Sequence, residues 1–128
     1  MSQRPEILIV EDDPFVVRAL SRMLGDRWDV VAVPDVPAAR ELLATPRFAG
    51  VIVDLWLSDG ADGFEVVEIA RRHDRLRPVI VVTGLASQGL GARAAKLGAL
   101  FAEKPPSRGD FAAFEDDALA YASKLTSS

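Results

Sequence analysis

Hydrophobic residues along the chain form two kinds of pattern. Five short runs, rich in β-branched side chains, predict strands that are buried on both faces. They are Ile7–Val10, Val30–Val33, Val51–Val53, Val79–Val82 and, less strongly, Leu100–Ala102. Between and after these runs, apolar residues recur at helical spacing and predict five helices. Strict alternation of strand and helix favours an α/β fold, with a parallel sheet, helices on both faces and right-handed crossovers.

The predicted helices are not equally well marked. The fifth has a clear apolar stripe, formed by Phe111, Phe114, Ala118, Ala122 and Leu125. Asp13 before Pro14 is expected to cap the first helix, with proline at its first position. The fourth helix is the weakest, because four glycines lie in or around it and an interior glycine costs about 0.5–1 kcal/mol relative to alanine. We therefore expect segment 84–91 to be the most mobile part of the backbone.

Polar residues follow four of the predicted strands at their carboxyl ends. They are Glu11-Asp12-Asp13 after the first strand, Asp54 after the third, Thr83 after the fourth and Lys104 after the fifth. Because the strands are parallel, these side chains are expected to meet at one edge of the sheet. Ligands bind at that edge in open α/β folds.

The carboxylates of this edge predict a magnesium site. Several carboxylates in a small volume repel one another, and a hard divalent cation is the usual relief. Magnesium keeps several waters and takes one or two carboxylates, which suits Asp12 and Asp54, with Glu11 acting through water. The Thr83 hydroxyl and the Lys104 ammonium would both stabilise an anion on Asp54. Together these groups predict a phosphoryl-transfer site with an aspartate nucleophile.

Each of these residues has a simpler interpretation when it is taken alone. Asp54 and Thr83 would more often be turn residues, and Lys104 a solvated lysine. Asp13 is better explained as a helix cap than as a metal ligand. His73, after the third helix, is interpreted as solvated and not as a phosphodonor. The functional prediction therefore rests on the joint pattern.

The strand-end motifs resemble those of response-regulator receiver domains, in a likeness that extends from residue 6 to about 124. The matching stretches are Ile7–Asp13, Val53-Asp54-Leu55, Val82-Thr83-Gly84 and Glu103-Lys104-Pro105. The resemblance implies a flavodoxin-like, doubly wound (βα)5 fold with a five-stranded parallel sheet in the order 2-1-3-4-5. It also implies a single receiver domain over 1–128, with an ordered core of about 6–124.

The same resemblance implies a two-component signalling function. Asp54 would accept a phosphoryl group from a histidine kinase or a histidine phosphotransfer protein. Glu11 and Asp12 match the family's metal pair, which would bind Mg²⁺ together with Asp54 and the backbone carbonyl of Trp56. Lys104 matches the lysine that pairs with the phosphate. The chain would then be a phosphoacceptor that catalyses only its own phosphorylation and slow autodephosphorylation, and not an enzyme in the ordinary sense.

Two further residues match the switch of this family. Thr83 would be drawn toward the phosphoryl oxygens and vacate space that Phe101 can occupy. A downstream protein target or output domain would then bind the face formed by the fourth helix, the fifth strand and the fifth helix, and a homodimer is compatible with the resemblance. Trp56 and Leu85, two residues after Asp54 and Thr83, would flank the hydrolytic water. Neither can orient a water, so we expect slow self-dephosphorylation.

Three departures from the family pattern lie near the site. The loop between Asp54 and Gly63 is one residue longer than usual. The approach from Gly98 to Lys104 is one residue shorter, which leaves the position of Phe101 open. Pro106 follows Pro105 where a large apolar residue is frequent.

Other functions remain open from the sequence. One is a phosphorylation-independent interaction module with the receiver shape, against which the intact site residues argue. Another is a small aspartyl-phosphate phosphatase, but such enzymes usually have a second acidic residue two positions after the nucleophile, where this chain has Trp56. A third is that the chain is the receiver part of a longer regulator or hybrid kinase.

Composition narrows the function classes further. The 128 residues suit one domain, and 49% hydrophobic with 27% charged residues is typical of a soluble globular protein. The absence of cysteine excludes disulfides and thiolate metal sites. A net charge of −4 argues against direct nucleic-acid binding. No apolar run approaches membrane-spanning length, and we expect a cytoplasmic protein with no membrane partner.

Overall fold

The computed structural model describes residues 4–57, 60–84 and 88–126, and its elements follow the predicted alternation. Leu85 and part of segment 84–91, on which two of the expectations above depend, lie outside the described residues. The elements are β1 (Glu6–Val10), α1 (Pro14–Leu24), a 3₁₀ turn (Gly25–Arg27), β2 (Asp29–Val33), α2 (Val36–Leu43), β3 (Phe48–Asp54), α3 (Gly63–His73), β4 (Val79–Thr83), α4 (Leu90–Lys96), β5 (Leu100–Glu103) and α5 (Arg108–Thr126).

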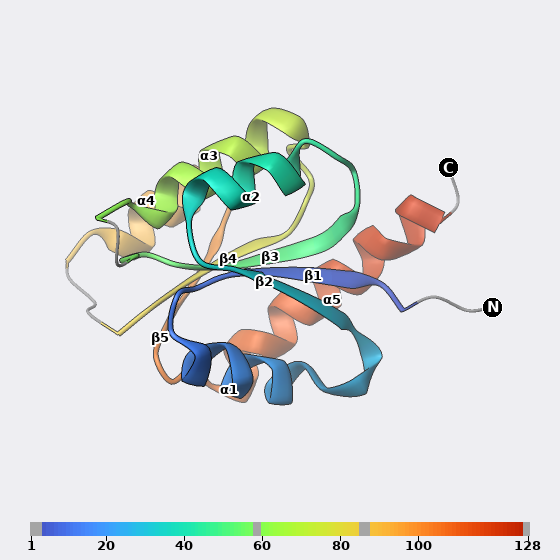
Figure 1. The fold of residues 1–128 in the computed structure, drawn as a ribbon, viewed down its shortest axis with the longest axis horizontal. Coiled ribbons are helices and arrows are strands. Elements are labelled where there is room, and N and C mark those ends of the chain that lie inside the picture. Colours follow the sequence, from blue (N-terminus) through green and yellow to red (C-terminus); the bar gives the residue numbers. More distant parts are fainter. Residues whose placement is uncertain (1–3, 58–59, 85–87, 127–128) are drawn as a thin grey trace.

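The five strands form one parallel sheet in the order β2-β1-β3-β4-β5. Helices α1 and α5 cover one face, and α2, α3 and α4 cover the other (Figure 1). The fold is therefore the flavodoxin-like α/β arrangement that the sequence predicts.

Strand β3 lies at the centre of the core, and all seven of its residues are buried. Val51 and Val53 point into the layer of α2, α3 and α4, whereas Ile52 points into the layer of α1 and α5. This is the period-2 alternation of a strand buried on both faces. Each such side chain contributes about 1.5–3 kcal/mol of burial free energy, which makes β3 a rigid base for Asp54 at its end.

The start of β3 differs from the sequence prediction, which placed it at Val51. The strand begins three residues earlier, with Gly50 in its interior and a register irregularity opposite Glu6 and Ile7. Glycine has a low strand propensity, so the pattern underestimates the strand. A Cβ on Gly50 would lie 2.7 Å from the Phe114 ring, so only glycine lets α5 approach β3 this closely.

The observed helix ends confirm the prediction for the start of α1 and differ from the sequence pattern for α4. The Asp13 carboxylate accepts a hydrogen bond of 2.9 Å from the Phe15 N–H and caps α1, as predicted. Helix α4 is shorter than its apolar pattern suggests, since it begins after Gly89 in the left-handed region and Leu97 is already its C-cap.

No helix among the described residues is both long and apolar enough to cross a membrane.

Candidate functional site

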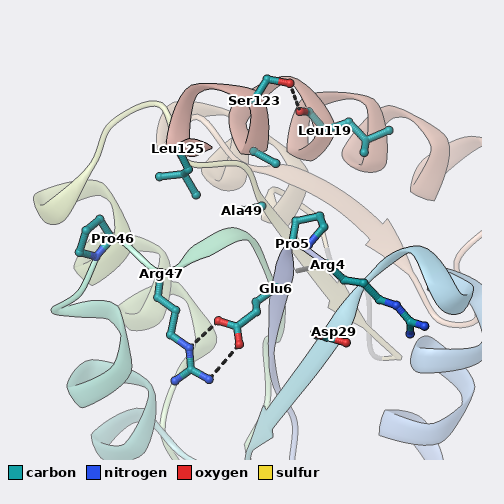
Figure 2. A pocket seen from close by; sticks show the side chains of 11 residues that line it. Arg4, Pro5, Glu6, Asp29, Pro46, Arg47, Ala49, Leu119, Ser123 and Leu125 are labelled. Atoms are coloured by element: carbon teal, nitrogen blue, oxygen red, sulfur yellow. Dashed lines mark hydrogen bonds and ion pairs between the residues drawn. The ribbon is translucent and has the colours of Figure 1, made fainter. Parts of the chain in front are cut away.

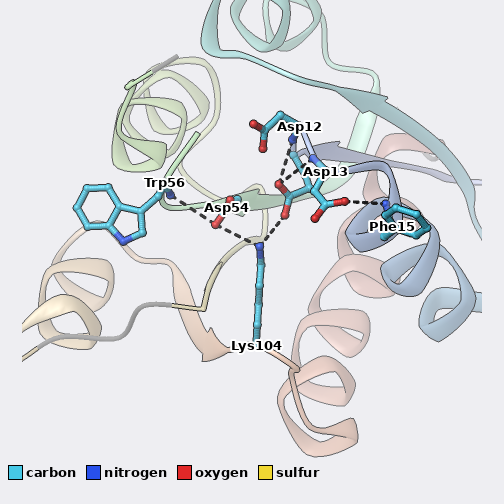
Figure 3. A network of polar contacts seen from close by, with 7 residues as sticks. Asp12, Asp13, Phe15, Asp54, Trp56 and Lys104 are labelled. Carbon is cyan, nitrogen blue, oxygen red and sulfur yellow. Dashed lines mark hydrogen bonds and ion pairs between the residues drawn. The ribbon is translucent and has the colours of Figure 1, made fainter. Parts of the chain in front are cut away.

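Four strand ends place polar side chains at the carboxyl edge of the sheet (Figure 3). Glu11 follows β1 and is only 4% exposed, while Asp54 ends β3 and is 9% exposed. Thr83 ends β4 and is fully buried, and Lys104 follows β5. The parallel sheet therefore assembles residues that are distant in the sequence.

Lys104 joins two of the carboxylates. Its Nζ lies 2.6 Å from Glu11 Oε1 and 3.4 Å from Asp54 Oδ1. The backbone N–H of Lys104 donates to the Thr83 carbonyl at 2.9 Å, which continues the β4–β5 ladder that pairs Thr83 with Glu103. The shorter approach to β5 thus leaves Lys104 within reach of the site.

Glu11 is held in place by donors on both of its carboxylate oxygens. Oε1 accepts from Lys104, and Oε2 accepts from the backbone N–H groups of Asp12 and Asp13 at 3.0 and 3.3 Å. Burial raises the pKa of Glu11, the hydrogen bond from Lys104 opposes that rise, and the charge of Asp54 adds to it. Burial works against the charged form of Lys104, but the hydrogen bond to Glu11 and the charges of both carboxylates outweigh it and raise its pKa.

Glu11, Asp12 and Asp54 form a group that fits a divalent cation. One carboxylate oxygen from each lies within 4.8 Å of the other two. Three carboxylates against the single ammonium of Lys104 leave a formal charge of −2, which a divalent cation would neutralise. Because both oxygens of Glu11 already accept hydrogen bonds, Asp12 and Asp54 are the better candidates for direct coordination.

The loop after Asp54 folds back on the end of β3. The Trp56 N–H donates to Asp54 Oδ1 at 3.4 Å, and Trp56 pairs with Asp62, which caps α3 through the Phe64 N–H. The Trp56 side chain is 49% exposed, and its indole extends away from Lys104 and the acidic residues (Figure 3). Its expected effect on phosphate hydrolysis therefore stays a prediction that no contact tests.

Gly63, the first residue of α3, contributes to the site in a way that sequence analysis missed. A Cβ at this position would lie 2.2 Å from the Asp54 carbonyl oxygen and 2.9 Å from the Leu55 Cα. Its own N–H donates to the Leu55 carbonyl at 2.8 Å. The Asp62-Gly63 pair before a helical pattern was the only available signal, and it indicates a capped helix start without revealing the close approach.

The two proposed switch residues lie on the neighbouring strands β4 and β5. Thr83 is enclosed at the end of β4, one residue beyond the Val82 that pairs with Asp54. Phe101 in β5 is partly buried on the side of α4, and its Cδ1 would be 3.7 Å from a Cβ on Gly91. The site thus unites Glu11, Asp12, Asp54 and Lys104 directly, whereas Phe101 packs under α4.

Comparison with known families agrees with this geometry. The model of the response regulator receiver domain family matches residues 7–112, which include all the site residues described above. The chain belongs to the response regulator receiver domain family. Receiver domains are phosphoacceptors of two-component signal transduction rather than true enzymes, and they pair with histidine kinases.

Curated relatives are longer than this receiver domain. The photosynthetic apparatus regulatory protein RegA of Rhodovulum sulfidophilum is 32% identical over 115 residues, which are 88% of this chain and 62% of RegA. The chain spans 22–62% of the length of the curated relatives it matches.

Solved receiver domains show the same fold. The non-phosphorylated HemR receiver domain of Leptospira biflexa is 29% identical, with a TM-score of 0.76 over 90% of this chain and 94% of that one. The receiver domain of sensor histidine kinase PA1611 of Pseudomonas aeruginosa is 25% identical, with a TM-score of 0.75 over 91% and 98% of the two chains. It holds a magnesium ion in its active-site cleft. The beryllofluoride-activated NtrC4 receiver domain, 25% identical with a TM-score of 0.79 over 91% and 98%, is a dimer.

Proposed function

We propose that this receiver domain is a phosphorylation-controlled switch in which Asp54 accepts a phosphoryl group from a histidine kinase or a histidine phosphotransfer protein. The observation that carries the proposal is the position of Asp54: its carboxylate ends the central strand, 3.4 Å from the Lys104 ammonium and grouped with two further carboxylates. A nucleophilic oxygen, a cation and a cation-binding group are the parts that phosphoryl transfer requires.

The transfer itself is a displacement at phosphorus. An Asp54 oxygen attacks the phosphohistidine phosphorus, the new P–O bond forms as the P–N bond breaks, and the donor imidazole takes up a proton as it leaves. Lys104 pairs with the phosphoryl oxygens, and to do so it must share or exchange its present contact with Glu11. The step needs no general base, because the attacking oxygen of a carboxylate nucleophile has no proton to lose.

Magnesium fits this site as the resident ion. Asp12 and Asp54 would hold it directly, Glu11 through water, and the Trp56 backbone carbonyl would add a ligand. When bound, the ion supplies neutralisation of the charge that gathers on the phosphoryl oxygens. The formal charge of −2 on the carboxylate–lysine group, and the magnesium in the PA1611 relative, support this assignment.

The switch would work through the two residues at the neighbouring strand ends. Thr83 would move toward a phosphoryl oxygen, and Phe101 would rotate toward the space it leaves. Because Phe101 packs under α4, this exchange changes the α4–β5–α5 face, where we place a downstream target or a second copy of the domain. The NtrC4 dimer is a precedent for such an assembly.

The direct test is incubation of the chain with magnesium and a small phosphodonor such as phosphoramidate, followed by intact mass. One phosphoryl adduct is expected, and none in Asp54→Asn. Asp12→Asn should lose at least about tenfold in rate, because a direct metal ligand is lost.

Asp13→Asn is the matched control for the metal ligand. Asparagine is as good an N-cap as aspartate, and Asp13 is outside the acidic group, so its rate should stay within about twofold of the wild type. An adduct that persists in Asp54→Asn would contradict the proposed nucleophile. No adduct in the wild-type chain would favour a phosphorylation-independent interaction module.

A further inference from the structure

Two cavities lie at the amino edge of the sheet, opposite the Asp54 site. The larger, about 650 Å³, is lined by two cations, Arg4 and Arg47, and two anions, Glu6 and Asp29, and Arg47 is already paired with Glu6 (Figure 2). Its charges balance, so its lining favours no class of ligand.

The smaller cavity, about 270 Å³, is strongly basic. We call it the basic pocket; its charged lining consists of Arg71, Arg75, Arg77 and Lys124 against the single carboxylate of Asp117. Four cations around one small volume contrast with the net charge of −4 of the whole chain. An arrangement of this kind concentrates anions.

Arg77 is the distinctive residue of the basic pocket. It is 1% exposed, and within the described part of the chain its Nε and Nη1 have no hydrogen-bond partner. Its Nη2 donates to the Thr45 carbonyl in a long contact of 3.4 Å. A buried guanidinium with unpaired N–H groups carries a large desolvation cost, and the charge of an anion in the adjacent pocket would offset part of it.

Asp74 supplies only part of that compensation: its charge and that of Arg77 attract each other, but the Asp74 carboxylate makes no hydrogen bond to Arg77 Nε or Nη1. The Asp74 carboxylate accepts the Tyr121 hydroxyl and the Leu76 N–H, the latter at 2.9 Å. Arg71 donates to the carbonyls of Leu97, Gly98 and Arg77, so its guanidinium is held rigidly at the wall of the basic pocket. Guanidinium groups gathered around one cavity are usual elements of a phosphate site.

We propose that the basic pocket binds a small phosphate-bearing anion, either inorganic phosphate or a phosphomonoester, with Arg77 as a buried cation in its wall. The volume decides the size of the ligand. It is many times the roughly 30 Å³ that one water occupies in the liquid, and it falls at the lower limit of small-molecule pockets, so it suits a compact anion and excludes a dinucleotide-sized cofactor. The site is separate from the phosphorylation chemistry, because it lies at the other end of the strands.

The test is titration of the metal-free chain with inorganic phosphate at constant low ionic strength, followed by amide NMR. Saturable shifts are expected at Arg77, Gly98 and Tyr121. Arg75→Glu, at an exposed position of the lining, should weaken phosphate binding by at least about fivefold. Arg75 is substituted rather than Arg77 because Arg77 is buried, and replacing it would also affect folding.

Arg72→Glu is the matched control, since it makes the same charge change three residues earlier, in the last turn of α3, without lining the pocket. Its affinity should stay within about twofold of the wild type. A second titration with glycerol 3-phosphate distinguishes the two kinds of ligand. If glycerol 3-phosphate binds more tightly than inorganic phosphate, the ligand is a phosphomonoester; if it binds more weakly, the ligand is free phosphate. The proposal is overturned if the shifts occur only around Thr83 and Lys104, if none saturate, or if the two glutamate variants bind equally.

Discussion

At the scale of single residues, the most informative polar contact outside the site is between Tyr121 and Asp74. Tyr121 on α5 donates its hydroxyl to the Asp74 carboxylate, which follows α3 on the other face of the sheet. Burial opposes the charged form of Asp74, but the Tyr121 hydroxyl, the Leu76 N–H and the charges of Arg77 and Arg71 together lower its pKa. Burial and the hydrogen bond to Asp74 raise the pKa of Tyr121.

Tyr121→Phe is expected to destabilise the fold by about 1 kcal/mol at neutral pH. This is the usual contribution of a hydrogen bond to a charged group, reduced because solvent screens the pair. Because the pKa of Asp74 is lowered in the folded state, its ionised carboxylate stabilises the fold at pH values above the ordinary carboxyl pKa of about 4. This stabilisation is lost as the pH falls through the lowered pKa. Because the pKa of Tyr121 is raised in the folded state, its protonated hydroxyl stabilises the fold at pH values below the ordinary phenol pKa of about 10. This stabilisation is lost as the pH rises through the raised pKa. The difference between wild type and variant in urea unfolding should therefore be largest near pH 7 and shrink toward pH 3. A difference that stays constant over this range would exclude the ionised Asp74 as the acceptor.

At the scale of secondary-structure elements, two contacts tie α3 to its surroundings at the site. Its first residue, Gly63, packs against the backbone of Asp54, and its cap, Asp62, pairs with Arg93 of α4 at 3.4 Å. Arg93 also lies over the Phe64 ring, 4.2 Å from its centroid. The start of α3 therefore connects the phosphoacceptor strand to the short helix α4.

Gly63→Ala is expected to destabilise the fold by about 1–3 kcal/mol and to slow phosphorylation of Asp54, because the added methyl group meets backbone atoms that cannot move aside cheaply. Gly109→Ala is the control: at the first turn of α5 its new Cβ would meet only Ser107 Oγ at 3.7 Å, so a neutral or slightly stabilising effect is expected. Chemical denaturation of both variants measures the difference. Equal stabilities would mean that α3 can shift away from β3 without cost.

Arg93→Ala should loosen α4 with little change in global stability. An exposed ion pair and a cation–π contact contribute about 0.5–1 kcal/mol each at most. Their loss is therefore expected to make local opening of α4 easier rather than to lower global stability. Faster amide hydrogen exchange is expected in α4, compared with wild type and with Lys96→Ala, which removes an exposed charge from the same helix. Exchange in α4 that is as slow in Arg93→Ala as in Lys96→Ala would show that Arg93 does not anchor the helix.

At the scale of the whole molecule, the sheet separates two charged regions. Carboxylates gather at the carboxyl edge around Asp54, and guanidinium groups gather at the amino edge around Arg77. The rigid, fully buried strand β3 and its neighbour β4 lie between them. Each region concentrates like charges, and each is expected to gain stability from a counter-ion.

Magnesium should therefore stabilise the folded chain. At a magnesium concentration of about 100 times Kd, the free energy of unfolding is expected to rise by about 2.7 kcal/mol, because the ion binds the folded state and relieves the repulsion of the carboxylates. Thermal unfolding with magnesium and with a chelator measures this. Asp12→Asn should lose most of the gain and Asp13→Asn should retain it; a gain of the same size in both variants would place the ion elsewhere.

The sequence by itself determined the order and type of the elements, the Asp13 cap and the edge at which Glu11, Asp54 and Lys104 meet. These features depend on local periodicity and on the rule that parallel strands end together, and both can be read from neighbouring residues. Only the tertiary structure decided that Gly63 touches the Asp54 backbone, that α4 stops at Lys96, and that Arg77 is buried beside the Asp74–Tyr121 pair. The physical reason is that helix ends and the closeness of such approaches are decided by the packing of helices on the sheet rather than by any local pattern.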